Sequence, residues 1–177
     1  ASLDDADLRN TLVELRLLRG AVAYLTGAAL AVAGVIVQGL FRNPLASPDI
    51  LGTSAGASFA GKLSLLLFQA TLGTGAARYL DPEMFLPVGC LLGAFCALLV
   101  LLRITRRSED AVVLLLSGFL LSALFLALGT LVTSVAQESW EVGRAVIAFA
   151  LGSVTGAGLR QLGIITPIAL FGTIAAM

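Results

Sequence analysis

The side chains that most often carry enzymatic or metal chemistry are scarce in this sequence. It contains no histidine and two cysteines, Cys90 and Cys96. These cysteines lie six positions apart on one expected helix, so they point in largely different directions and cannot form a disulfide with each other. The carboxylates fall mostly in expected loops and at helix ends, and the sequence has no G-x-x-x-x-G-K-[ST] motif. We therefore expect no enzyme activity, no metal site, no cofactor and no ATP site in this chain.

The residues whose types and spacing stand out lie instead within long apolar runs. Lys62 is the one basic residue well inside such a run. An ionisable group at membrane depth is costly and is a functional candidate by default. Its long side chain also allows the simpler interpretation that the amine reaches the membrane surface from a tilted helix. We keep both, with Lys62 as a candidate residue of a translocation pathway.

A second group of candidates follows helical spacing between positions 118 and 133. The intervals are four, three, four and four, so all five side chains share one helical face. This small and weakly polar face either packs against a neighbouring helix or lines a cavity, and the spacing does not distinguish the two. As candidate pathway residues it comprises Gly118, Ser122, Phe125, Gly129 and Thr133.

Composition indicates the solvent that surrounds these elements. Of the 177 residues, 58% are apolar and 12% are charged, with a net charge of zero. Disorder would require a more polar chain, and nucleic-acid binding would require a basic surplus, so both are excluded. A bilayer-spanning helix needs ~20 mostly uncharged residues. Five runs meet that demand, and they predict an all-α, polytopic transmembrane helix bundle with a single transmembrane domain over residues 1–177. The expected spans are 11–41, 48–70, 84–103, 111–136 and 159–177.

Two connections have recognisable local signals. Asn43 and Pro44 end the first helix, which begins near residues 4–7 and projects beyond the membrane, because proline disfavours helical angles in the residue before it. Ser47 is then expected to cap the second span at its N-terminus, with Pro48 in the first helical position and Asp49 in the first turn. A short helix over residues 139–150, capped by Ser139, is too short to span the membrane.

The order of motifs resembles one known family, the permease subunits of type II ABC importers for iron-siderophores, haem and cobalamin. The motifs are LRLLR at 15–19, GAAL at 27–30, QGLFRNPLA at 38–46, LGTSAGA at 51–57, and segments at 116–124 and 151–156. The sequence departs from the family pattern at Leu18, where proline is usual, and at Ser47, where an acidic residue is common. The resemblance covers the N-terminal to middle portion of such a subunit.

The resemblance implies function and partners. The chain would be part of a permease that moves an iron-siderophore, or a haem- or cobalamin-like chelate, across the inner membrane of a bacterium or archaeon by ATP-driven alternating access. Its partners would be a second permease subunit, ABC ATPase subunits that hydrolyse the ATP, a periplasmic or lipid-anchored binding protein, and membrane lipid. Arg16 and Arg19 would face carboxylates on the binding protein.

The resemblance also orients the chain, which the charges alone do not. It places the turn with Asn43, Pro44, Ser47 and Asp49, and the RITRRSED loop at 103–110, in the cytoplasm, and the 139–150 helix at the outer face. Because such subunits have roughly ten spans, we expect these residues alone not to transport. The alternative function is a structural or scaffold membrane protein without a transport pathway.

Overall fold

All regular elements in the described part of the chain are helices, as the sequence predicts. The computed structural model describes residues 5–72, 82–106, 110–152, 162–163, 166–167 and 172. Its elements are α1 (Asp5–Phe41), η1 (Pro48–Leu51), α2 (Thr53–Leu72), α3 (Pro82–Thr105), α4 (Ala111–Ala136) and α5 (Trp140–Leu151). The contacts divide the chain into two units, one with Ala1–Leu45 and Ser153–Met177, the other with Ala46–Gly152.

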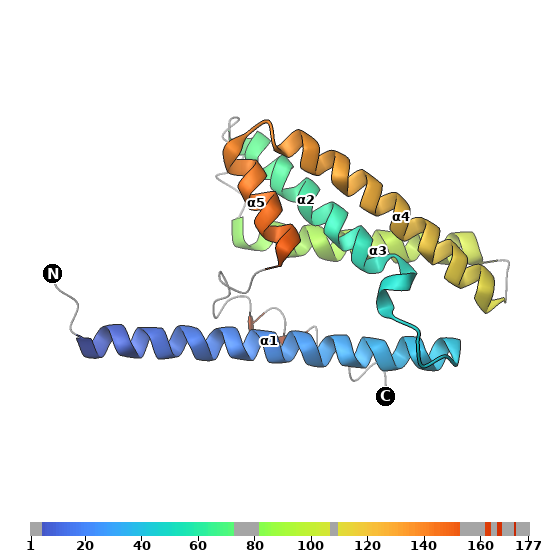
Figure 1. Cartoon of the computed structure of the whole chain (residues 1–177), viewed down its shortest axis with the longest axis horizontal. Coiled ribbons are helices and arrows are strands. Elements are labelled where there is room, and N and C mark those ends of the chain that lie inside the picture. Colours follow the sequence, from blue (N-terminus) through green and yellow to red (C-terminus); the bar gives the residue numbers. More distant parts are fainter. Residues whose placement is uncertain are drawn as a thin grey trace. The chain divides into compact units, whose positions relative to one another are not determined.

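The first unit contains α1, a helix of 37 residues (Figure 1). At 1.5 Å per residue it is about 55 Å long, well beyond the ~30 Å of a bilayer's hydrocarbon core. It ends in a Schellman motif, in which Asn43 N–H donates to Gln38 O and Arg42 N–H donates to Gly39 O. Arg42 takes the left-handed conformation (φ +49°) that this ending requires. The predicted end of the first helix is confirmed, and the first described residue, Asp5, is already helical.

The turn that follows differs from the prediction in one respect. Ser47 is an N-cap, and its Oγ accepts a hydrogen bond from Asp49 N at 3.3 Å, but it caps the short 3-10 helix η1 and not the second long helix. The reason is Gly52, whose left-handed backbone (φ +79°) breaks the helical path after Leu51. α2 therefore begins at Thr53, and the expectation that Ser47 and Pro48 start the second span is corrected.

The second unit is built around α2, which contacts α3, α4, α5 and η1 (Figure 1). Small residues make the closest approaches. A Cβ added to Gly56 would lie 2.6 Å from the Cβ of Ala97 and 2.9 Å from the carbonyl oxygen of Gly93, both on α3. Close approach through small residues is the means by which helices associate in lipid, where apolar side chains gain little from leaving their solvent.

Three described helices contain segments long and apolar enough to cross a membrane, namely Arg9–Phe41, Met84–Thr105 and Val112–Ala136. They correspond to three of the five predicted spans. The second prediction, 48–70, falls largely on α2, which is less apolar because it carries serines and Lys62. A helix surrounded by three others exposes less of its surface to lipid, so it needs fewer apolar side chains. The fifth prediction, 159–177, lies mostly outside the described residues.

The predicted short helix is α5, whose 12 residues span about 18 Å, too little to cross a bilayer. It packs on α2 and α4 through Val142, Gly143 and Val146, which are buried. Ser139 occupies the N-cap position, as predicted, although its side chain makes no capping hydrogen bond. The helix ends at Gly152, which has a positive φ of +73°.

Candidate functional site

The small, weakly polar face of α4 packs against η1 and α2 within this chain. Gly118 is buried, and a Cβ added there would lie 3.1 Å from the Cα of Leu51. Four residues later, Ser122 Oγ donates to Gly118 O at 3.0 Å and also lies 3.1 Å from Asp49 O in η1. Of the two interpretations that the spacing left open, packing therefore describes the first half of this face.

Phe125 continues the same contact one turn further along α4. Its ring lies 5.8 Å, centroid to centroid, from that of Phe59 on α2, with the two planes tilted by 30°. Ring pairs at this separation add to the stability that burial already provides. Phe125 thus holds α4 against α2 and is only partly exposed.

Lys62 lies on α2 and extends toward the same face of α4. A Cβ added to Gly129 would lie 3.6 Å from the Nζ of Lys62 and 3.8 Å from its Cδ, so the lysine side chain extends across α4 where a glycine leaves room. Thr133 Oγ1 donates to the carbonyl oxygen of Gly129 at 2.8 Å. The packing of α2 on α4 therefore brings Lys62 to Gly129, and Thr133 follows one turn further along α4. We call these three residues the lysine seam.

The face of α4 opposite to this contact is exposed. It also contains small and weakly polar residues at helical spacing, and sequence reasoning did not single it out. They are Ala123, Ala127, Thr130 and Ser134. The signal was present in the spacing, but which of two similar faces packs inward depends on the neighbouring helices.

The residues of the predicted cytoplasmic turn lie on both sides of the boundary between the two units. Asn43 and Pro44 are exposed, and the side-chain oxygen of Asn43 accepts a hydrogen bond from Leu45 N at 2.9 Å. In the other unit, Ser47 Oγ donates to a carboxylate oxygen of Asp49 at 3.4 Å while it accepts from Asp49 N. Each part of the turn is thus held by its own local hydrogen bonds.

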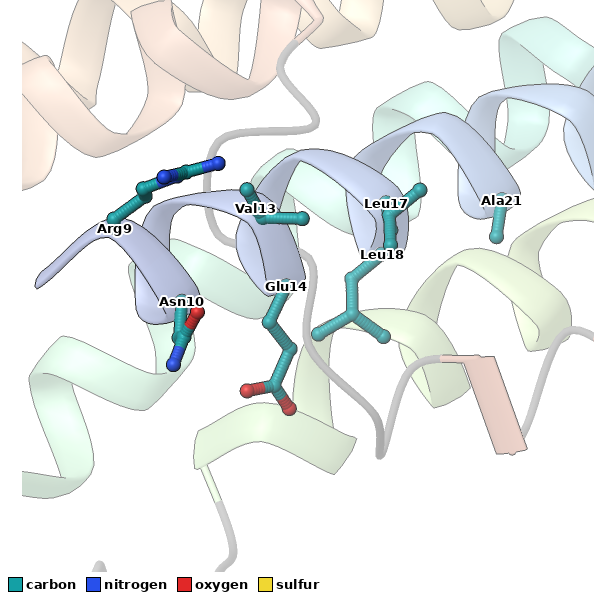
Figure 2. Close-up of a pocket in the computed structure, with 7 residues that line it drawn as sticks. All are labelled: Arg9, Asn10, Val13, Glu14, Leu17, Leu18 and Ala21. Atoms are coloured by element: carbon teal, nitrogen blue, oxygen red, sulfur yellow. The ribbon is translucent and has the colours of Figure 1, made fainter. Parts of the chain in front are cut away.

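The start of α1 carries the predicted docking arginines. Arg16 is exposed and Arg19 is half-buried. A hollow of about 740 Å³ runs along this part of the helix (Figure 2), and its lining residues are Arg9, Asn10, Val13, Glu14, Leu17, Leu18 and Ala21. Neither predicted arginine lines the hollow, so Arg16 and Arg19 are side chains of the helix surface next to it.

The cysteines and carboxylates do not form a metal-binding group within the described residues. Cys90 is half-buried on α3, and its sulfur lies 2.8 Å from where a Cβ on Gly61 would be. Cys96 is exposed on the same helix. Both are free thiols, as their spacing predicts.

Comparison with known proteins identifies the family. Residues 1–177 match the model of the FecCD transport family. The chain is 42% identical over 117 residues to the Fe(3+) dicitrate transport system permease protein FecD of Escherichia coli K12, which is 66% of this chain and 33% of that protein. It is 38% identical over 117 residues to the vitamin B12 import system permease protein BtuC of Escherichia coli O1:K1, with the same two coverages.

A solved structure supports the same family assignment. It is an inward-facing conformation of a protein assigned to the metal-chelate type of ABC transporters, with a TM-score of 0.79 and 27% identity. The similarity covers 97% of this chain and 50% of that one, so the chain spans half or less of each protein it resembles. On the family match over residues 1–177, the chain belongs to the FecCD transport family.

Proposed function

We propose that this chain is part of the permease of an ABC importer that moves a metal chelate across the inner membrane by ATP-driven alternating access. The observation that carries this proposal is the match of all 177 residues to a transport family. The three helices able to cross a membrane are consistent with it. Within that family, an iron-siderophore is the proposed substrate class, and a haem- or cobalamin-like chelate is the alternative, since one relative is a ferric dicitrate permease and another a vitamin B12 permease.

Energy and substrate delivery are assigned to other subunits in this proposal. ATP would be hydrolysed by paired ABC ATPases in the cytoplasm, and a second permease subunit would complete the pathway. A periplasmic or lipid-anchored binding protein would deliver the chelate. The two compact units would then act together as one multi-pass transmembrane domain in a bacterial or archaeal inner membrane.

The binding protein would dock at the outer end of α1. Arg16 is exposed there and Arg19 partly so. Arginine recognises carboxylates with two parallel hydrogen bonds, which suits it to hold an acidic residue of a partner protein. In the same orientation, the turn from Asn43 to Asp49 and the loop at 103–110 lie in the cytoplasm.

The lysine seam, where α2 meets α4, is the part of the chain that we assign to the translocation pathway most directly. A charged side chain inside the hydrocarbon core has an unfavourable free energy of transfer from water, so such a residue generally serves a function. The position of Lys62 Nζ beside Gly129 supports this assignment, because an added side chain at position 129 would meet the lysine. Gly118, Ser122 and Phe125 would support the pathway from behind, because they hold η1 and α2 against α4.

Uptake by cells tests the proposed function. The host strain lacks its own permease for ferric dicitrate. The full-length subunit is expressed in it, and the ATPase and binding protein that belong to this subunit are expressed alongside. Accumulation of iron-55 supplied as dicitrate should rise well above that of the empty strain. Accumulation of cyanocobalamin instead of iron would support the alternative substrate, and uptake of neither would exclude both of these chelates as the substrate.

A further inference from the structure

Near its C-terminus, α3 has two faces of different character. Ala97, Leu101 and Thr105 are buried, and they follow one another at intervals of four residues. The other face borders a groove of about 390 Å³, lined by Cys96, Leu99, Val100, Arg103 and Ile104. We call this feature the α3 groove.

The α3 groove is apolar along its length and has a cation at one end. Arg103 lies seven positions after Cys96, which corresponds to about 10 Å along the helix. Arg103 lies in the last turn of α3, and Arg106 follows it directly after the helix ends; both side chains are exposed. A phospholipid has a matching arrangement, because its apolar acyl chain is joined to an anionic phosphate. The acyl chain would lie along the apolar part of the groove and the phosphate would lie at the guanidinium.

The position of the groove along α3 also suits a phospholipid. The segment of α3 long and apolar enough to cross a membrane is Met84–Thr105, and Arg103 lies two residues from its end. In a helix that crosses the bilayer, this position corresponds to the boundary between hydrocarbon and headgroups. An arginine at this depth gains from a bidentate contact with a phosphate. The nearest described carboxylate along the chain, Asp110, accepts a hydrogen bond from Val112 N as the N-cap of α4.

The lining residues favour a lipid over another helix as the occupant. Where α3 meets α2, the contact is made by glycine and alanine, as at Gly56 and Gly93. Small residues of this kind allow two helix backbones to approach each other in a membrane. The described lining of the α3 groove is instead one face of α3 that carries leucine, valine and isoleucine, whose branched side chains keep a second backbone at a distance but fit a flexible acyl chain.

We propose that the α3 groove binds an anionic phospholipid, with the lipid phosphate on Arg103 and one acyl chain along Val100 and Cys96. Arg106 adds positive charge beside the same headgroup. The proposal does not depend on which chelate is transported, because it rests only on the membrane position of α3.

Quenching of a single tryptophan by brominated lipids tests this site in the full-length subunit. Phe95, which is 56% exposed, does not line the groove but lies one residue before Cys96, so Phe95→Trp places a probe there. All other tryptophans, including Trp140, are replaced by phenylalanine. The subunit is reconstituted in bilayers of phosphatidylcholine that contain dibrominated phosphatidylglycerol or dibrominated phosphatidylcholine at the same mole fraction.

Phosphatidylglycerol should occupy the site about fivefold more readily than phosphatidylcholine, the preference that one basic residue near a headgroup provides. Arg103→Gln should remove most of this preference, and Arg103→Lys should retain part of it. Arg144→Gln, which removes an exposed arginine on α5, is the matched control and should leave the preference unchanged. Equal quenching by both lipids in the unsubstituted groove, or no quenching by either because protein covers it, would overturn the proposal.

Discussion

The contact between α2 and α3 yields the most direct prediction about the fold. In Gly56→Ala, the new methyl group would lie 2.6 Å from the Cβ of Ala97 and 2.9 Å from the carbonyl oxygen of Gly93. Neither atom belongs to a flexible side chain, so the two helices must separate. Overpacking of this kind costs about 1–3 kcal/mol. Replacing a helical glycine by alanine returns at most about 1 kcal/mol. We expect a net loss of roughly 1–2 kcal/mol in the free energy of unfolding.

Gly129→Ala is the matched control, because it makes the same chemical change on α4 in the same unit. The added methyl group would meet Lys62 Nζ at 3.6 Å, an ordinary van der Waals distance to the end of a flexible side chain. This variant should therefore be neutral or slightly more stable than the parent protein.

The assay is unfolding of the purified full-length subunit in mild detergent, titrated with sodium dodecyl sulfate and followed by circular dichroism. Gly56→Ala should unfold at a clearly lower fraction of the denaturing detergent than Gly129→Ala. Equal midpoints for the two variants would refute the close α2–α3 contact on which the packing of this unit is based.

Three further predictions concern single side chains. Ser122→Ala should lower the free energy of unfolding by about 1 kcal/mol, the usual loss for one hydrogen bond, whereas Ser134→Ala, on the exposed face of α4, should change it little; equal losses would count against the contact with η1. Lys62→Met should preserve detergent stability but reduce chelate uptake at least tenfold, and full uptake would remove the lysine from the pathway. Reversing charge with Arg16→Glu and Arg19→Glu together should abolish stimulation of ATP hydrolysis by the binding protein while basal hydrolysis persists; unchanged stimulation would mean that the protein docks elsewhere.

The helices of this fold are predictable because the charges delimit them. α4 was expected over residues 111–136 and is observed as Ala111–Ala136. The charges at its two ends mark the limits of the apolar run. Within that run the chain must be helical, since backbone groups in lipid must form their hydrogen bonds within a helix. The end of α1 was equally clear, because Asn43 and Pro44 follow it.

Local backbone geometry was less predictable. Ser47, Pro48 and Asp49 are a sound helix-start signal, and they do start a helix, but it is the four-residue η1. The decisive residue is Gly52, which adopts a left-handed conformation. Glycine is compatible with both helical and left-handed angles, so its type alone does not show where one helix stops and the next begins.

Long-range pairing within the candidate site was not predictable from spacing. The hydroxyl of Ser122 meets the carbonyl oxygen of Asp49, 73 residues away in the sequence. Likewise, Lys62 stands out by its charge and Gly129 by its place in a helical repeat, and only the packing of α2 on α4 brings the two together. Two faces of α4 have small residues at the same helical spacing, and only the packing of η1 and α2 shows which of the two is covered.

Transport by the purified system tests the central claim most directly. The full-length subunit, its ATPase and its binding protein are reconstituted in proteoliposomes, and the accumulation of iron-55 supplied as dicitrate is measured with and without ATP. The proposed function predicts accumulation that requires both ATP and the binding protein and that stops when the ATPase is inactivated by substitution. If iron accumulates equally with and without ATP, or continues to accumulate after the ATPase is inactivated, the claim that this chain is part of an ATP-driven chelate importer is contradicted.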